Sequence, residues 1–241
     1  MREILVTVSA GFFGVMGSGL LAWVAGPLFR GRGARAPAGG GRGGVLVLIP
    51  AHNEALTLPD TLKSVRAAAG SRARIIVGAD QCTDSTETRA RAGGAEVIQV
   101  NFRSKWKTLA AIAKFAGPED WVALVDSGAV WPSGLLADLE PFLLDPSTMA
   151  VAPAYFPRNA SLLERIVWQV EAFWKRGENL AGGPVSTHGA TVFYRAEVLA
   201  AVFTYLERFG REQWLNDDIA LPFAARILFP GSFLRYWILK K

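Results

Sequence analysis

Between residues 45 and 125, short apolar runs alternate with segments in which apolar residues recur at helical spacing. The run Val45–Ile49 is apolar throughout, which is typical of a strand buried on both faces of a sheet. Leu58, Leu62 and Val65 have the spacing of one face of a helix. We expect strands at Val45–Ile49, Arg74–Val77, Glu96–Val100 and Trp121–Val125, and helices at Leu56–Ala69, Ser85–Ala92 and Lys107–Phe115. This alternation predicts an α/β fold with a mostly parallel, doubly wound sheet.

Acidic side chains follow three of these expected strands. Glu54 lies beyond the first strand, Asp80 beyond the second and Asp126 beyond the fourth. Ligands of open parallel sheets bind outside the carboxyl ends of the strands, so these carboxylates are candidate binding groups. They could accept hydrogen bonds from a base or a ribose, or hold a divalent cation against a phosphate. Ordinary turn and N-cap roles explain Asn53 and Asp84 well, but explain three acidic strand ends less well.

Four segments, spread from about Val45 to about Phe229, together carry a resemblance to a known family. VLVLIPAHNEALTLPDTLKSV resembles the opening of family-two glycosyltransferases, and IIVGADQCTDST resembles their second strand and turn. STHGATVFYRAEVL resembles their acceptor-side segment, and NDDIALPFAARI resembles the segment that carries the catalytic base. The resemblance implies a GT-A fold, a UDP-, GDP- or dTDP-sugar as donor, and transfer with inversion at the anomeric carbon.

The resemblance also implies which residues bind the donor. Pro50, Ala51 and Glu54 would line the nucleotide pocket, and Asp80 would contact the nucleobase. Asp126 takes the first position of the family's DxD motif, which contacts the ribose and the diphosphate. Because a carboxylate at Asp80 suits the imide of uracil, we expect the donor to be a UDP-sugar.

An acceptor hydroxyl that attacks an anomeric carbon must lose its proton, so the reaction needs a general base. The adjacent carboxylates of Asp217 and Asp218 are the candidates. The resemblance favours Asp218, because the family's base ends an acidic triplet, and Asp217 is the second candidate. Asp217 could instead cap the helix that we expect to begin near Ile219.

The third position of the DxD motif departs from the family. It is Gly128, and glycine has no side chain to bind the Mg²⁺ or Mn²⁺ that family members normally hold there. Either Asp126, water and the diphosphate hold the metal ion, or the enzyme needs none. His188 could add a ligand or touch the donor, although a single histidine is more often a hydrogen-bonding structural residue.

Basic residues follow the third expected strand, where the family often has a segment that contains Gly and Lys. They are Arg103, Lys105 and Lys107. Either Lys105 or Lys107 could neutralise the diphosphate, and the resemblance does not separate the two. The solvated start of a helix explains them equally well.

The N-terminal stretch Ile4–Phe29 contains no ionisable side chain. A helix of this length crosses a hydrocarbon core of about 30 Å, whereas a cleaved signal peptide would have a shorter apolar region. We therefore expect a membrane anchor at 4–29, a Gly/Arg-rich linker at 30–44 and the catalytic domain at 45–241. More arginines follow the stretch than precede it, which by the positive-inside rule places the catalytic domain in the cytoplasm. A stripe of small residues would allow a homodimer through the anchor: Ala10, Gly14, Ser18, Ala22 and Gly26.

The net charge of +5 suggests an anionic partner. Much of the charge lies beside the apolar stretch and no nucleic-acid-binding motif accompanies it, so we expect anionic lipid and not nucleic acid. Aromatic and basic residues also interleave at 165–175 and 229–241, which suits a bilayer interface, although we expect most of these aromatics in the core. A lipid-linked hydroxyl acceptor is compatible with this location.

Two other functions fit parts of the sequence. A catalytically inactive membrane partner would explain Gly128, but the intact Asp80, Asp126 and Asp218 argue against it. A sugar nucleotidyltransferase would have a Gly-rich loop after the first strand, where this chain has PAHNE. The QxxRW motif of processive polymerising members is missing, so we do not expect a polysaccharide synthase.

Overall fold

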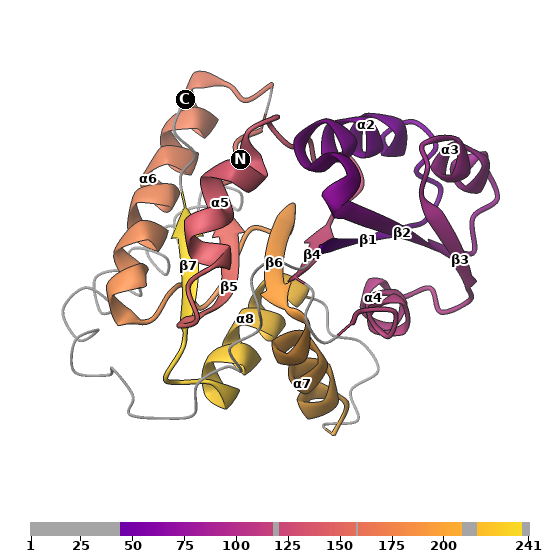
Figure 1. Ribbon diagram of the computed structural model, residues 1–241. Helices are drawn as coiled ribbons and strands as arrows, with labels where there is room; N and C mark the ends of the chain where they lie inside the picture. Colours follow the sequence, from indigo (N-terminus) through magenta and orange to yellow (C-terminus); the bar gives the residue numbers. More distant parts are fainter. Residues whose placement is uncertain (1–43, 118–120, 158, 209–215, 238–241) are drawn as a thin grey trace, which may run out of the picture.

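The computed structural model describes residues 44–117, 121–157, 159–208 and 216–237 of the chain. They form an α/β fold around one seven-stranded sheet with the strand order β3-β2-β1-β4-β6-β5-β7 (Figure 1). The strands are β1 (Val45–Ala51), β2 (Ala73–Asp80), β3 (Glu96–Val100), β4 (Trp121–Val125), β5 (Thr148–Pro153), β6 (Thr191–Arg195) and β7 (Phe233–Trp237). The predicted anchor and nearly all of the predicted linker lie outside the described residues. Within the described ranges, no helix is both long enough and apolar enough to cross a membrane.

The sheet is mostly parallel, as the sequence predicts. Strands β1 to β4 pair in parallel, and β5 pairs in parallel with β7. Strand β6 runs antiparallel to both of its neighbours, β4 and β5. The first four strands lie where the alternating pattern predicts them, and β3 and β4 have the predicted bounds.

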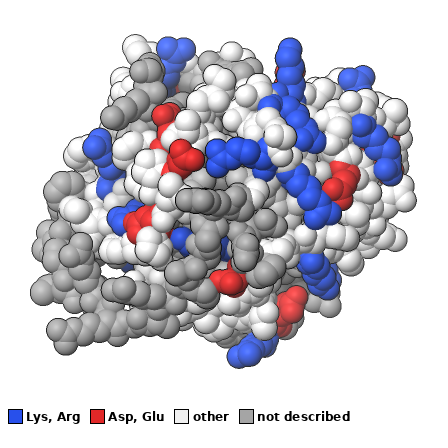
Figure 2. Space-filling view, viewed as in Figure 1, with Lys and Arg blue, Asp and Glu red and all other residues white. Residues whose placement is uncertain are grey.

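Helices cover both faces of the sheet (Figure 1). The helices are α2 (Leu58–Ala69), α3 (Thr86–Ala92), α4 (Lys105–Ala113), α5 (Leu135–Leu143), α6 (Leu162–Glu178), α7 (Ala196–Glu207) and α8 (Asp217–Leu228), with short 3₁₀ turns at Gly70–Arg72 and Asn179–Ala181. Buried side chains of α2, α3 and α5 share one core cluster, and those of α4, α7 and α8 share the other. Helix α6 packs near β7, at the end of the sheet opposite β3. On the face of the molecule that Figure 2 shows, basic and acidic side chains lie interspersed among uncharged ones.

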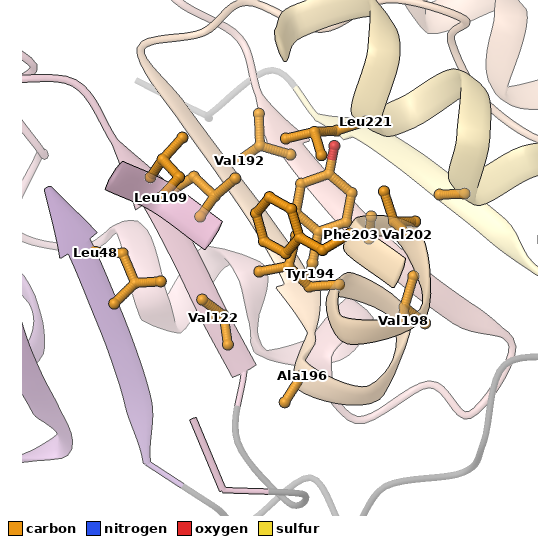
Figure 3. Close-up of a cluster of buried hydrophobic side chains, with 14 of the residues drawn as sticks. Leu48, Leu109, Val122, Val192, Tyr194, Ala196, Val198, Val202, Phe203 and Leu221 are labelled. Carbon is orange, nitrogen blue, oxygen red and sulfur yellow. The ribbon is translucent and has the colours of Figure 1, made fainter. Parts of the chain in front are cut away.

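Strand β1 shows how the sequence divides its side chains between the two cores. Leu46 and Leu48 join the cluster under α4, whereas Val45, Val47 and Ile49 join the cluster under α2. Successive side chains of a strand point to opposite faces, so a strand covered on both sides is apolar throughout. Figure 3 shows part of the α4-side core, which joins Tyr194 of β6 to the side chains of α7 and α8.

The sheet has a point at which the strand order reverses. The chain passes from β1 outward through β2 to β3 and then returns to β4 on the other side of β1. Such a reversal opens a crevice at the carboxyl ends of the two central strands. The residues after β1, β2 and β4 therefore come to the same edge of the sheet, together with the start of α4.

Candidate active site

Two open clefts meet at the carboxyl end of β4. One, of about 630 Å³, is named here the β1 cleft and is lined by residues that include Pro50, Ala51, Glu54, Asp80, Arg103, Lys105 and Asp126. The other, of about 610 Å³, is named here the α8 cleft and is lined by residues that include Asp126, Tyr155, Trp168, Lys175, His188, Gly189, Asp218 and Ile219. Asp126 and Ser127 line both clefts, so the first position of the DxD-like motif stands at their junction.

Asp80 is buried at the end of β2, and its carboxylate is hydrogen-bonded to the loop before α4 and to α4 itself. Its Oδ1 accepts hydrogen bonds from the backbone N–H groups of Phe102 and Arg103, at 2.8 and 3.0 Å. Its Oδ2 accepts from the backbone N–H of Ser104 at 2.9 Å and from the hydroxyl of Thr108 at 3.1 Å. Burial alone would raise the pKa of Asp80, but these hydrogen bonds outweigh it and lower the pKa below its ordinary value.

These four bonds use the acceptor positions of a carboxylate, which offers about four lone-pair sites. They hold the loop before α4 against β2 and so fix where α4 begins. The predicted contact between Asp80 and a nucleobase stays a prediction, and that contact would compete with the bonds to the loop.

Lys105, the first residue of α4, bridges two carboxylates from distant parts of the chain. Its Nζ lies 2.7 Å from Oδ1 of Asp126 and 3.0 Å from Oδ2 of Asp217. Burial by itself lowers the pKa of Lys105, but the two carboxylates raise it above its ordinary value, so the ammonium keeps its charge. For Asp126, burial raises the pKa above its ordinary value and outweighs the opposing effect of the Lys105 ammonium, while the charges of Asp217 and Glu54 add smaller contributions in the same direction as burial.

The structure also separates the two lysines that the sequence could not. Lys105 lines the β1 cleft, whereas Lys107 is not among the residues that line either cleft. The backbone N–H of Lys107 donates to the Ser104 hydroxyl, 3.4 Å away, at the N-cap of α4.

Asp218, in the first turn of α8, faces the α8 cleft. Burial raises its pKa to about 6, and the neighbouring charges of Asp217 and Asp126 add to the effect, while Lys105 and the backbone N–H of Gly189 oppose it. The backbone carbonyl of Asp218 accepts a hydrogen bond of 2.8 Å from the N–H of Thr187. Asp218 is therefore held against residues 187–189 and carries a carboxyl group that titrates near neutral pH.

Gly189 is what allows the carboxylate to lie so close to that segment. A Cβ atom at position 189 would stand 2.3 Å from Oδ1 of Asp218, far inside van der Waals contact. Any other residue would push the side chain of Asp218 away. The sequence gives no local signal of this approach, because the two residues belong to separate segments.

His188 is buried and packs among aromatic rings. Its Nε2 lies 3.0 Å from the hydroxyl of Tyr236, and its ring centroid lies 4.9 Å from that of Trp168. Burial, aided by the charge of Lys175, lowers the pKa of His188 to about 3, so the ring is neutral. This environment matches the structural role that the sequence left open for His188, and the metal role stays a prediction.

Two polar residues that follow the strands have the turn roles that the sequence suggested. Oδ1 of Asp84 accepts from the backbone N–H of Thr86 at 2.9 Å, and its Oδ2 accepts from that of Ala55 at 3.1 Å. Oδ1 of Asn53 accepts from the backbone N–H of Thr83 at 2.7 Å. Both residues therefore shape the turns beside the β1 cleft.

Helix α6 contributes residues to the α8 cleft that sequence reasoning missed. Trp168, Glu171 and Lys175 line the cleft from one face of this helix. Nζ of Lys175 donates to both the carbonyl and the hydroxyl of Ser186, each at 2.8 Å. Their spacing of three and four residues places them on one face of a helix, but the interleaved aromatic and basic residues of 165–175 predict a core or a bilayer interface and not a cleft lining.

The described residues do not fit a divalent-cation site of their own. Within these ranges, no group of three or more His, Cys, Asp or Glu side chains is placed to hold a metal ion. The carboxylate of Asp126 is bound by the Lys105 ammonium, Gly128 offers no side chain, and Nε2 of His188 faces a tyrosine hydroxyl.

The chain matches one protein family and resembles several proteins of known structure. The family described as "Glycosyltransferase like family 2" matches residues 42–228. No curated protein matches the chain. The mannosyltransferase PcManGT from Pyrobaculum calidifontis, solved with GDP-Man and Mn²⁺, is 20% identical with a TM-score of 0.63, over 98% of this chain and 68% of its own.

A second relative of known structure is glucosyl-3-phosphoglycerate synthase from Mycobacterium tuberculosis. Its complex with UDP is 19% identical to this chain with a TM-score of 0.50, over 83% of this chain and 72% of its own. Its complex with Mn²⁺, UDP and glucosyl-3-phosphoglycerate is also 19% identical with a TM-score of 0.50, over 83% of this chain and 72% of its own. At such identities the likeness is one of fold.

Proposed function

This chain belongs to glycosyltransferase family 2 and is a nucleotide-sugar-dependent glycosyltransferase with a GT-A-like fold, and we propose that it uses Asp218 as general base. In this proposal the nucleotide sugar occupies the β1 cleft and a hydroxyl acceptor occupies the α8 cleft. The sugar is transferred where the clefts meet, beside Asp126, in a single displacement with inversion at the anomeric carbon.

The observation that carries the proposal is the placement of Asp218. Its carboxylate lines the α8 cleft, and its pKa of about 6 leaves it mostly ionised at neutral pH and able to take a proton. As the acceptor oxygen bonds to the anomeric carbon, its proton passes to Asp218. The bond from that carbon to the diphosphate breaks, and the nucleoside diphosphate leaves with the electron pair. Asp217 suits the role less well, because its carboxylate is paired with Lys105.

The donor in this proposal is a UDP-sugar. Pro50, Ala51 and Glu54 line the β1 cleft at the end of β1, where the family resemblance puts the nucleotide. The relatives of known structure were solved with both kinds of nucleotide, GDP-Man in one and UDP in the other. Calorimetric titration of the purified chain with UDP and GDP tests this choice, and tighter binding of GDP by about tenfold would overturn it.

The acceptor in this proposal is a hydroxyl compound carried by a lipid. Ile219 lines the α8 cleft next to the proposed base, and Phe223 and Ile227 follow it at helical spacing, with 48%, 53% and 47% of their surfaces exposed. An apolar stripe left in water on an amphipathic helix usually marks an interaction surface. A hydrocarbon chain on the acceptor would cover it while the hydroxyl reaches Asp218.

Membrane anchoring through residues 4–29, with the catalytic domain in the cytoplasm, is part of the same proposal. The uncharged stretch and the arginines that follow it support the anchor and its orientation, and the stripe of small residues supports self-association of the anchor helix. The full chain should remain in membranes after carbonate extraction, and a chain that begins at Gly44 should be released. Retention of the shortened chain would contradict a single N-terminal anchor.

Transfer itself is tested by incubating the full chain with UDP-, GDP- and dTDP-sugars and a membrane lipid extract. We expect release of the nucleoside diphosphate and a glycosylated lipid with one class of donor. Binding of UDP without any transfer would instead favour an inactive membrane partner, the alternative that Gly128 suggests. Formation of nucleotide sugar from a sugar phosphate would favour a nucleotidyltransferase.

A further inference from the structure

We propose that the ammonium group of Lys105 supplies the positive charge that receives the donor diphosphate, so that nucleotide binding by this chain needs no divalent cation. The inference rests on the proposed function, since it takes the β1 cleft as the nucleotide site. It goes beyond that function by assigning to one lysine the charge that a divalent cation could otherwise supply; the two relatives of known structure were solved with Mn²⁺.

The position of the ammonium is the first argument. Its Nζ lies 2.7 Å from Asp126 and 3.0 Å from Asp217, so it offsets part of the negative charge that would otherwise repel a diphosphate. An ammonium has three N–H donors. Two can point at these carboxylates, which leaves the third for an oxygen of a diphosphate in the β1 cleft.

The backbone at Gly128 is the second argument. It has a φ of +94°, a conformation that residues with a side chain rarely adopt. The turn is held in place, because the N–H of Gly128 donates to the Thr61 hydroxyl at 2.8 Å and the hydroxyls of Ser127 and Thr57 lie 2.9 Å apart. The family's metal-binding position is thus built around glycine, and restoring an aspartate there would strain the turn.

The loop that presents Lys105 is the third argument. Asp80 binds three successive backbone N–H groups of residues 102–104, which fixes the loop in front of α4. The fixed loop brings a second cation, Arg103, to the lining of the same cleft. Two cations on one hydrogen-bonded segment favour the binding of a diphosphate in this cleft, with Asp80 as the positioning residue behind them.

The test is calorimetric titration of the full chain in detergent micelles with UDP, first in chelator and then with added Mn²⁺. Loss of one charge-assisted hydrogen bond to a phosphate weakens binding by about tenfold or more. We expect the wild-type affinity to change by less than about threefold between the two conditions, and Lys105→Gln to lose about tenfold or more in both.

Two further variants separate charge from structure. Lys105→Arg keeps a cation and should keep most of the UDP affinity without metal. If Lys105→Arg and Lys105→Gln have the same melting temperature but differ in UDP affinity, the difference comes from the charge and not from a change in stability. Lys107→Gln removes a charge from the same helical turn outside the clefts and should bind UDP as the wild type does.

Three results would overturn the inference. The first is UDP binding that requires Mn²⁺, and the second is equal loss of affinity in Lys105→Gln and Lys107→Gln. The third is the absence of binding by UDP, GDP and dTDP with or without Mn²⁺. That last result would overturn the proposed function as well, which the first two would leave intact.

Discussion

The two halves of this molecule differ in how many large apolar side chains they leave exposed. In the half that contains β1 to β4, apolar side chains are mostly buried, and polar groups at the strand ends form the β1 cleft. In the half that contains β5 to β7, helices α6 and α8 leave large apolar side chains exposed, among them Leu162, Leu163 and Phe223. The polar cleft of the first half is the basis on which we propose nucleotide binding there, and the exposed apolar side chains of the second half are the basis on which we propose a lipid-linked acceptor.

This difference suggests a division of labour. A nucleoside diphosphate needs fixed polar groups and cations, which a rigid parallel sheet supplies at its carboxyl edge. Acceptors differ from one enzyme to the next, and residues on the outer face of a helix can change to bind a different acceptor without disturbing the sheet. The halves meet where Lys105 pairs with Asp126 from one half and with Asp217 from the other.

The largest expected effect concerns Asp218, in the acceptor half. Asp218→Asn keeps the size of the side chain but cannot accept the proton of the acceptor hydroxyl. General base catalysis contributes about 10²–10⁴-fold, which corresponds to about 3–5 kcal/mol of barrier. Turnover measured at saturating donor should fall by that factor.

Asp217→Asn is the matched control, because it changes the adjacent carboxylate that pairs with Lys105. It should cost less turnover and act mainly on UDP affinity and melting temperature. Retention of more than about a tenth of the wild-type turnover by Asp218→Asn, with chemistry rate-limiting, would move the base to Asp217.

The next largest effect should come from Gly189→Ala. The new Cβ would stand 2.3 Å from Oδ1 of Asp218 and would displace the carboxylate. Because a misplacement of about 1 Å can cost about a hundredfold in rate, we expect turnover to fall by about ten- to a hundredfold. Gly134→Ala is the control, since no atom lies within 4 Å of its added Cβ. Equal rates for the two variants would show that Asp218 does not act from this position.

Acidic pH should reduce transfer by a smaller factor. Since burial raises the pKa of Asp218 to about 6, the proposed base becomes protonated below that pH, and kcat/KM should fall about tenfold between pH 7 and pH 5. A profile that stays flat down to pH 5 would argue against Asp218.

The same shift predicts the stability of the variant. With a pKa of about 6 in the fold against an ordinary value of 3.8, the carboxyl of Asp218 stabilises the fold below pH 3.8 and loses that contribution as pH rises through 6. Asp218→Asn should therefore melt above the wild type at pH 8 and close to it near pH 4. Thermal melts at the two pH values check this sign.

The smallest effect should come from the apolar stripe of α8. Phe223→Ser removes apolar surface on which we place the lipid chain, so KM for a long-chain acceptor should rise severalfold while UDP affinity stays constant. Leu144→Ser is the control, because Leu144 has the same exposure of 53% as Phe223 but lies at the end of α5 and not on α8. An equal rise of KM for the long-chain acceptor in Phe223→Ser and Leu144→Ser would contradict the proposal that the lipid chain lies along α8.

The donor half was the more predictable from the sequence. Its strands are covered on both faces, so each appears as an apolar run, and the polar residues that follow mark the edge where ligands bind. The turn roles of Asn53 and Asp84 could be predicted for the same local reason. The sequence could not show which of Lys105 and Lys107 lines the β1 cleft, because this depends on the direction in which each side chain leaves α4.

The acceptor half was less predictable for physical reasons. Helix α6 exposes the apolar residues that would normally identify a buried face, so its pattern does not indicate which side lines the cleft. The bridge from Lys105 to Asp217 and the approach of Gly189 to Asp218 join segments far apart in the chain. Such contacts depend on the packing of whole elements and leave no local trace.

The division of labour is tested most directly by the UDP affinity of Asp218→Asn, measured by calorimetry beside the wild type. If Asp218 does not contribute to nucleotide binding, the two dissociation constants should agree within about twofold while turnover is lost. A loss of UDP affinity that parallels the loss of turnover would place Asp218 in the donor site and contradict the account.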